Sequence, residues 1–119
     1  MEIKRDYYLN KLINAKSDGL IKVITGIRRC GKSYLLNQLF YKYLKENNVE
    51  ENHIIKIALD DDENEELLNN KKLGSYIREK IKDKELYYIL LDEIQLVSNF
   101  ETVLNGLLRI ENVDIYVTG

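Results

Sequence analysis

The chain alternates short apolar runs with stretches of helical periodicity. Four runs rich in β-branched and other apolar residues predict strands, at residues 20–25, 53–59, 86–91 and 113–118. Between them, apolar residues recur at intervals of three and four and predict helices at residues 31–44, 73–81 and 100–108. The order β-α-β-α-β-α-β predicts an α/β fold of three layers, in which helices cover both faces of a parallel sheet.

Three local patterns refine these elements. The strand at residues 86–91 has almost no polar alternation, which predicts a strand buried on both faces. Ser98 and Glu101 match the S-x-x-E capping box and predict the start of the helix that follows. The acidic residues 60–63 lack the glycine and the distal glutamate of a calcium-binding EF-hand. We therefore interpret them as a loop that leads into a short helix, because acidic residues favour a first helical turn.

Composition and charge exclude several classes of protein. A chain of 119 residues, 45% of them hydrophobic, is long enough for one domain with a core. The net charge of -2 gives no basic excess for nucleic acid or a membrane surface. No apolar run approaches the roughly 20 residues that span a bilayer, and the N-terminus lacks the apolar region of a secretory signal. With a single cysteine, the chain is predicted to be cytoplasmic and to make no membrane contact.

A glycine-rich loop follows the first predicted strand. Residues Gly26, Ile27, Arg28, Arg29, Cys30, Gly31, Lys32 and Ser33 match G-x-x-x-x-G-K-[ST] at every fixed position. The glycines let successive N–H groups point at phosphate oxygens, and the following helix adds its positive end. Lys32 is predicted to contact the β and γ phosphates, as a binding and a catalytic residue, and Ser33 to ligate Mg²⁺. The predicted nucleotide-binding segment is residues 26–34 and so includes Tyr34; the alternative is a tight turn with an exposed lysine.

The middle of this loop carries unusual side chains. Arg28 and Arg29 occupy positions whose side chains usually point away from the phosphates. They are either solvated, or contact a partner subunit, a lid or a polyanion, or touch phosphate directly. Cys30 is a small filler or, because the helix end and Lys32 would lower a thiol pKa, a reactive group.

A second motif follows the strand at residues 86–91. Four apolar residues precede Asp92 and Glu93, which is the Walker B pattern. Asp92 is predicted to hold Mg²⁺, usually through water. Glu93 is predicted to polarise a water molecule for attack on the γ phosphate, with a solvated carboxylate as the alternative. Gln95 either helps to position that water or is a surface amide.

At these two motifs the sequence resembles the AAA+ branch of P-loop ATPases, and more narrowly a prokaryotic ATP-binding family with an AAA domain. The stretches that carry the resemblance are "IKVITGIRRCGKS", "LDDDENEELL", "YYILLDEIQLVSNFETVLNGL" and "VDIYVTG". The resemblance implies the strand order 2-3-4-1, with the fourth strand between the loop strand and the Walker B strand. It also implies a helical segment over residues 1–18, a P-loop core over residues 19–119, and a longer protein that continues past the fourth strand with a fifth strand, a lid, a sensor and an arginine finger.

The predicted function is an ATPase core that binds ATP or ADP with Mg²⁺ and hydrolyses ATP in the context of a longer protein, while turnover by these residues alone is slow. One alternative is a nucleotide-binding switch or scaffold with little turnover. A second is a nucleic-acid motor, with nucleic acid bound only by a region outside these residues, and a third is a small-molecule kinase. The strand at residues 20–25 is expected to be a bare sheet edge, and self-association through it is a further hypothesis.

Overall fold

A computed structural model gives the backbone of residues 2–24 and 29–119, and the side chains of residues 7–24 and 31–119. Its four strands form one parallel sheet in the order β1-β4-β3-β2. Read from the other edge this is 2-3-4-1, so the predicted order is confirmed. The strands are β1 (Lys22–Ile24), β2 (Ile54–Ala58), β3 (Tyr87–Asp92) and β4 (Val113–Thr118).

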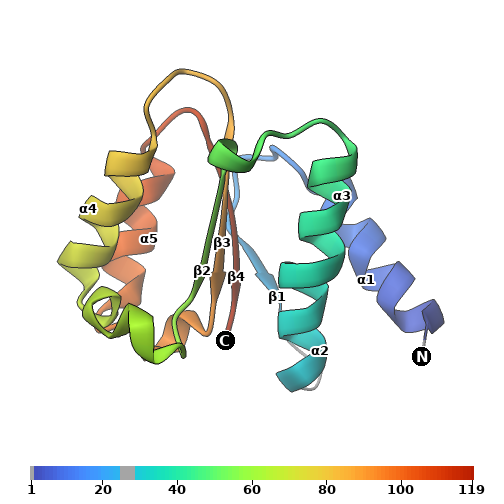
Figure 1. Cartoon of the computed structure of the whole chain (residues 1–119), viewed down its shortest axis with the longest axis horizontal. Coiled ribbons are helices and arrows are strands. Elements are labelled where there is room, and N and C mark those ends of the chain that lie inside the picture. The colour runs from blue at the N-terminus through green and yellow to red at the C-terminus, as the bar shows by residue number, and fades with distance from the viewer. Residues whose placement is uncertain (1, 25–28) are drawn as a thin grey trace.

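Helices cover both faces of this sheet, which confirms the predicted three-layer α/β fold (Figure 1). On one face lie α1 (Glu2–Asn14), α2 (Arg29–Tyr34) and α3 (Tyr41–Glu46), and on the other lie α4 (Asn70–Lys80) and α5 (Phe100–Leu108). Short 3₁₀ turns occupy Glu51–His53, Asp62–Leu68 and Ile94–Leu96. The second of these is the predicted short helix, but it begins within the acidic run, with Asp62 and Glu63 in its first turn, and the Asp61 side chain accepts a hydrogen bond from the Glu63 N–H at 2.9 Å.

The helix after the glycine-rich loop is continuous but not uniform. Between α2 and α3, residues Leu35–Phe40 have π-helical geometry, in which each turn is wider than in an α-helix. The run ends at Asn47, and Asn48 takes a left-handed conformation with φ of 68°. Asparagine tolerates this conformation better than most residues, so the two asparagines are suited to the end of the helix.

The core has two parts, one on each face of the sheet. Ile89, Leu91 and Leu107 are buried on the side of α4 and α5, whereas Leu90 and Phe40 are buried on the side of α1 to α3. All six residues of β3 are buried, as its apolar sequence predicted. The strand that ends in the acidic motif is therefore held from both faces.

The predicted capping box is wrong. Helix α5 has Asn99 as its N-cap, in a left-handed conformation with no side-chain cap. The N–H of Ser98 donates instead to the carbonyl of Leu68 at 3.0 Å. This tertiary contact with the preceding 3₁₀ turn places Ser98 outside the helix start.

A buried ion pair fixes the entry to β1. The Lys22 ammonium lies 2.5 Å from an oxygen of Asp114 on β4 and 2.8 Å from Asp18. Asp114 also accepts hydrogen bonds from the Ser17 N–H and the Tyr116 hydroxyl, each at 2.8 Å. Burial, together with the hydrogen bond to Asp114, raises the pKa of Tyr116 far above its usual value. These bonds join the segment between α1 and β1 to the centre of the sheet.

The two edges of the sheet are β1 and β2. As expected, β1 pairs only with β4 among the described strands, and the side chain of Val23 is 59% exposed. Self-association through this edge stays a prediction. None of the helices within the described residues is long and apolar enough to cross a membrane, and the cytoplasmic location also stays a prediction.

Candidate functional site

The carboxyl ends of β1, β3 and β4 meet at one edge of the sheet. Because the three strands are parallel neighbours, the residues that follow them are brought together from distant parts of the sequence. The Ser33 hydroxyl donates to the two carboxylate oxygens of Asp92 at 3.0 and 2.9 Å. The structure thus places the serine of the glycine-rich loop directly against the acid that ends β3.

Asp92 is buried, with 3% of its surface exposed. Burial of a carboxylate is costly unless hydrogen bonds replace its water. Besides Ser33, the Thr118 hydroxyl donates to Asp92 at 2.5 Å and the side-chain amide of Asn37 at 3.4 Å. Three polar side chains from three elements therefore orient this carboxylate.

Thr118 is a site residue that the sequence interpretation did not identify as one. It ends β4, is fully buried, and accepts a hydrogen bond from the Glu93 N–H at 2.9 Å while donating to Asp92. The only sequence signal is the Thr-Gly pair at the end of a predicted strand. The hydroxyl matters here because β4 lies next to β3.

Asn37 is the second residue that sequence reasoning missed. It lies in the π-helical segment, four residues after Ser33, so it faces the same side of the helix. Its amide nitrogen contacts Asp92, whereas its Oδ1 is buried and has no hydrogen-bond partner among the described residues. A buried acceptor without a donor points to a water molecule or an ion at that place.

Glu93 directly follows Asp92 in a left-handed conformation, with φ of 62° and ψ of 50°. This conformation is costly for a residue with a side chain and is concentrated at functional sites. The turn directs the Glu93 N–H at Thr118 and leaves its partly exposed carboxylate to accept a hydrogen bond from the Gln95 amide at 2.6 Å. Gln95 therefore contacts Glu93 directly.

The other predicted positions are partly outside the described structure. Gly26, Ile27 and Arg28 lie outside the described residues, as do the side chains of Arg29 and Cys30. Gly31 and Lys32 are partly buried in α2, and Tyr34 is 41% exposed at its end. The roles of all these residues toward a nucleotide stay predictions.

The oxygens around Asp92 suit a hard divalent cation. Mg²⁺ prefers oxygen ligands, is bound by one or two carboxylates, and keeps several of its waters. Ser33 and Asp92 supply a hydroxyl and a carboxylate within hydrogen-bond distance of each other, and the orphaned Oδ1 of Asn37 can accept a hydrogen bond from a metal-bound water. The residues present therefore fit the magnesium site predicted at Ser33 and Asp92.

The chain is similar to one protein family and to proteins of two organisms. A family model described as an AAA domain matches residues 18–119. An uncharacterised protein of Haemophilus influenzae is 36% identical over 118 residues, which is 98% of this chain and 29% of that protein. An uncharacterised protein of Methanocaldococcus jannaschii is 33% identical over 121 aligned residues, 98% of this chain and 24% of that protein. The chain thus spans less than a third of each relative, and no solved structure matches it.

Proposed function

Since the chain belongs to the AAA domain family of ATPase-like nucleotide-binding domains, we propose that it binds ATP with Mg²⁺ and contributes to ATP hydrolysis. The observation that carries the proposal is the pair of hydrogen bonds between Ser33 and Asp92. These residues come from two motifs that lie 59 positions apart, and each motif predicts a magnesium ligand. Their contact supports a shared metal site.

Each residue has a proposed task. The backbone N–H groups of residues 26–33 bind the phosphates, and Lys32 contacts the β and γ phosphates. Ser33 and Asp92 hold Mg²⁺, which neutralises charge on the phosphate oxygens when it is bound. Asn37 and Thr118 keep the Asp92 carboxylate in place.

Glu93 is the proposed general base. Its carboxylate accepts a hydrogen bond from the Gln95 amide. When Glu93 takes a proton from water, this hydrogen bond has to lengthen, or the carboxylate oxygen has to contact both Gln95 and the water. The left-handed turn fixes the Glu93 backbone while the side chain stays partly exposed. Glu93 can therefore change its hydrogen-bond partner without a change in the sheet.

Nucleotide binding is tested by thermal unfolding with and without saturating Mg-ATP. A ligand at 100 times its dissociation constant adds about 2.7 kcal/mol, and each kcal/mol raises Tm by roughly 4–8 °C for a domain near 100 residues. Lys32→Ala should abolish this shift, whereas Lys42→Ala, at an exposed position of α3, should keep it. Absence of a shift in the folded parent chain would refute the proposal.

Hydrolysis is tested separately from binding. Glu93→Gln should keep the thermal shift and lower the rate of phosphate release by about 10²- to 10⁴-fold, which is the usual contribution of a general base. If the parent chain releases phosphate at a measurable rate and Glu93→Gln leaves this rate unchanged, another group activates the water. That result would refute the catalytic role of Glu93.

We propose that Arg28 and Arg29 do not contact the phosphates. The double substitution by alanine should then leave nucleotide affinity within a few-fold of the parent value. A titration with labelled ATP, with Lys32→Ala as the comparison, measures this. A loss as large as that of Lys32→Ala would show direct phosphate contact.

A further inference from the structure

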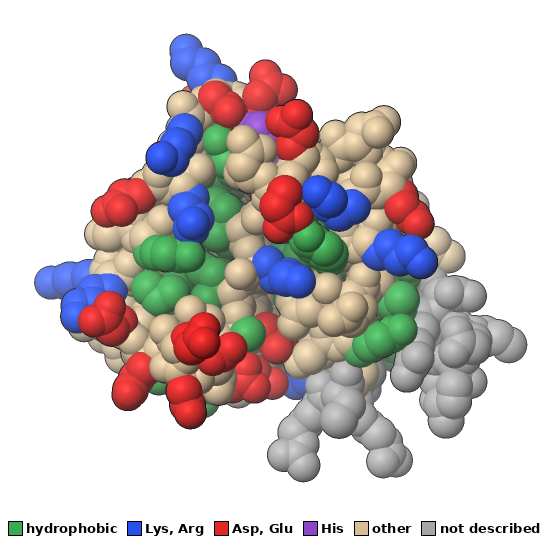
Figure 2. Space-filling model, in the orientation of Figure 1, with side chains coloured by type: hydrophobic (Ala, Val, Ile, Leu, Met, Phe, Trp, Pro, Cys, Tyr) green, Lys and Arg blue, Asp and Glu red, His purple; other side chains and the backbone are tan. Residues whose placement is uncertain are grey.

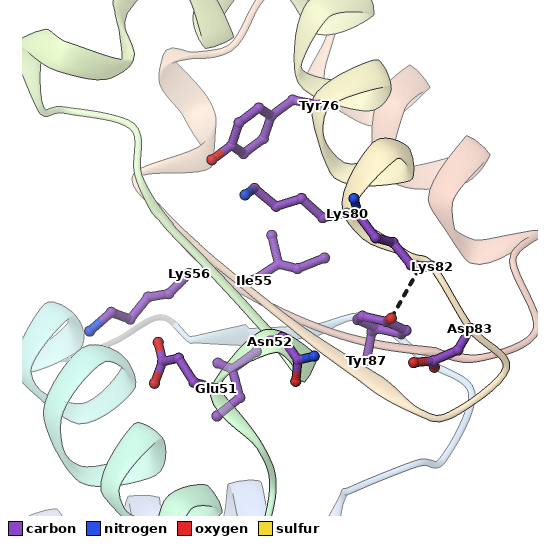
Figure 3. A pocket seen from close by; sticks show the side chains of 10 residues that line it. Glu51, Asn52, Ile55, Lys56, Tyr76, Lys80, Lys82, Asp83 and Tyr87 are labelled. Atoms are coloured by element: carbon purple, nitrogen blue, oxygen red, sulfur yellow. Dashed lines mark hydrogen bonds between the residues drawn. The ribbon is translucent and has the colours of Figure 1, made fainter.

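A groove of about 440 Å³ runs beside β2, toward the amino ends of β2 and β3 and away from the Ser33–Asp92 contact. Its residues come from β2, from the 3₁₀ turn before it, from α4 and from the segment after α4. One wall is formed by α4 and the segment after it, and the other by β2 and the turn before it. The side chain of Ile55 lies between these two walls (Figure 3). Figure 2 shows this face of the molecule hollowed, with apolar side chains in the hollow and basic side chains on both sides of it.

The backbone of β2 is open toward this groove. The Leu59 N–H donates to the Asp92 carbonyl at 3.0 Å, so the backbone groups of Leu59 point to β3. Backbone groups of every second residue in a strand point to the same side, so those of every second residue of β2 before Leu59 also point to β3. The backbone N–H and carbonyl groups of Ile54, Lys56 and Ala58 therefore point away from β3. The Ile54 N–H is bonded to the Glu51 carbonyl, and the Ala58 carbonyl accepts from the Asp61 N–H at 3.2 Å.

Lys56 lies between these two closed ends. Its N–H and carbonyl form no hydrogen bond outside the sheet within the described part of the chain. Its ammonium lies 4.1 Å from the centre of the Tyr41 ring, on the side of α3, so the side chain does not cover its own backbone groups. The edge of β2 thus offers backbone groups that an additional strand can pair with.

Positive charge is in excess around the open edge. Lys56, Lys80 and Lys82 line the groove, and none of the three forms an ion pair within the described residues. Lys80 lies 4.8 Å from the centre of the Tyr76 ring on the α4 wall.

The two carboxylates of the groove are already engaged. Glu51 accepts from the Tyr41 hydroxyl and lies 3.4 Å from the Lys45 ammonium. Asp83 contacts the Nε2 of His53 at 3.0 Å and accepts from the Glu85 N–H at 2.8 Å. The three lysines nevertheless outnumber these two carboxylates, so the lining of the groove keeps a net positive charge.

We propose that this groove binds an extended acidic segment of a partner protein. The segment adds to the sheet at Lys56 through main-chain hydrogen bonds, and its carboxylates contact Lys56, Lys80 and Lys82. In this mode of recognition the backbone supplies affinity and the pattern of side chains supplies specificity. A strand is favoured over a compact anion because the lysines lie on both walls, with an open strand edge between them (Figure 3).

The test measures fluorescence anisotropy of a labelled octapeptide with the sequence Glu-Glu-Thr-Thr repeated twice, which places glutamates on both faces of an added strand. The peptide should bind the chain, and Lys80→Glu with Lys82→Glu should weaken binding by at least about tenfold, because two attractive charge pairs become repulsive. The matched control is Lys71→Glu with Lys72→Glu, at exposed positions near the start of the same helix, which should change affinity less than about twofold.

Two further peptides separate strand pairing from simple charge attraction. A version N-methylated at all eight residues keeps the charge and loses every backbone N–H donor, so it should bind much more weakly. A version with lysine in place of glutamate should not bind. Equal binding of the methylated peptide, or no binding of the parent peptide, would overturn the proposal and leave the lysines as a device that keeps other strands off this edge. Tighter binding of a single-stranded oligonucleotide that depends on Lys80 and Lys82 would also overturn it.

Discussion

The hydroxyl of Thr118 joins the ends of β3 and β4 through hydrogen bonds, and its removal should lower the free energy of unfolding. Thr118→Val keeps the shape of the side chain and deletes both hydrogen bonds, to Asp92 and from the Glu93 N–H. A hydrogen bond to a charged group contributes about 1.5–3 kcal/mol, and a buried N–H left without a partner costs about 1–3 kcal/mol. Because Glu93 is partly exposed, water can reach its N–H, so we expect the lower end of the sum, about 2.5 kcal/mol.

Equilibrium unfolding in urea measures this loss. For a domain of this size the slope is about 1–3 kcal/mol per molar urea, so the midpoint should fall by about 1–3 M with an unchanged slope. Thr102→Val is the matched control, since Thr102 is exposed on α5 and should change stability by less than about 0.5 kcal/mol. If Thr118→Val loses no more than this control, the hydroxyl does not hold Asp92 and Glu93 together.

Three further predictions follow from described contacts. Lys22→Met leaves the buried carboxylate of Asp114 without its cation and should lower the free energy of unfolding in urea by about 3 kcal/mol. This is the low end of the range for a broken buried pair, because other donors to Asp114 remain. A loss below about 1 kcal/mol would contradict this prediction. Asn37→Ala should raise the Mg²⁺ concentration needed for half of the ATP-induced thermal shift by about tenfold, as expected for a residue that orients metal ligands, and an unchanged titration would exclude that role. The hydrogen bond from Tyr41 lowers the pKa of Glu51, so its stabilising effect is present above the unfolded pKa and is lost as the pH falls through the folded pKa; Tyr41→Phe should therefore raise the Glu51 pKa in an NMR titration, and the stability difference from the parent should vanish in acid.

Much of the fold could be predicted because local patterns and tertiary packing agree. The strand Val113–Thr118 has the predicted bounds, and the uninterrupted apolar run before Asp92 is buried on both faces. The start of α5 could not be predicted in the same way. Ser98 and Glu101 have the spacing of a capping box, yet the Ser98 N–H bonds to Leu68, 30 positions earlier, and a contact of that range leaves no mark in the local sequence.

The site residues also divide into those that local sequence identifies and those that depend on tertiary contacts. Ser33 and Asp92 could be identified because phosphate and magnesium chemistry requires particular residue types at particular places after a strand. Thr118 and Asn37 could not, because their roles depend on which strands are neighbours and on the phase of the helix. The π-helical segment changes that phase locally, and no residue type in Leu35–Phe40 announces it.

Because β4 lies between β1 and β3, these two strands cannot join one sheet until β4, the last of the described strands, is available. Ile24 ends β1 and Val113 begins β4, so 113 − 24 = 89 positions separate a strand from its only partner in the described structure. At a synthesis rate of roughly 5–20 residues per second, about 4–18 s pass between the synthesis of β1 and that of β4. During this time the backbone groups of β1 are unpaired and can contact chaperones or neighbouring chains. The unit of β2, α4 and β3 is local in sequence and can form during this time. We therefore expect the contact between Ser33 and Asp92 to form only after β4 has paired with β1 and β3, late in the folding of these residues.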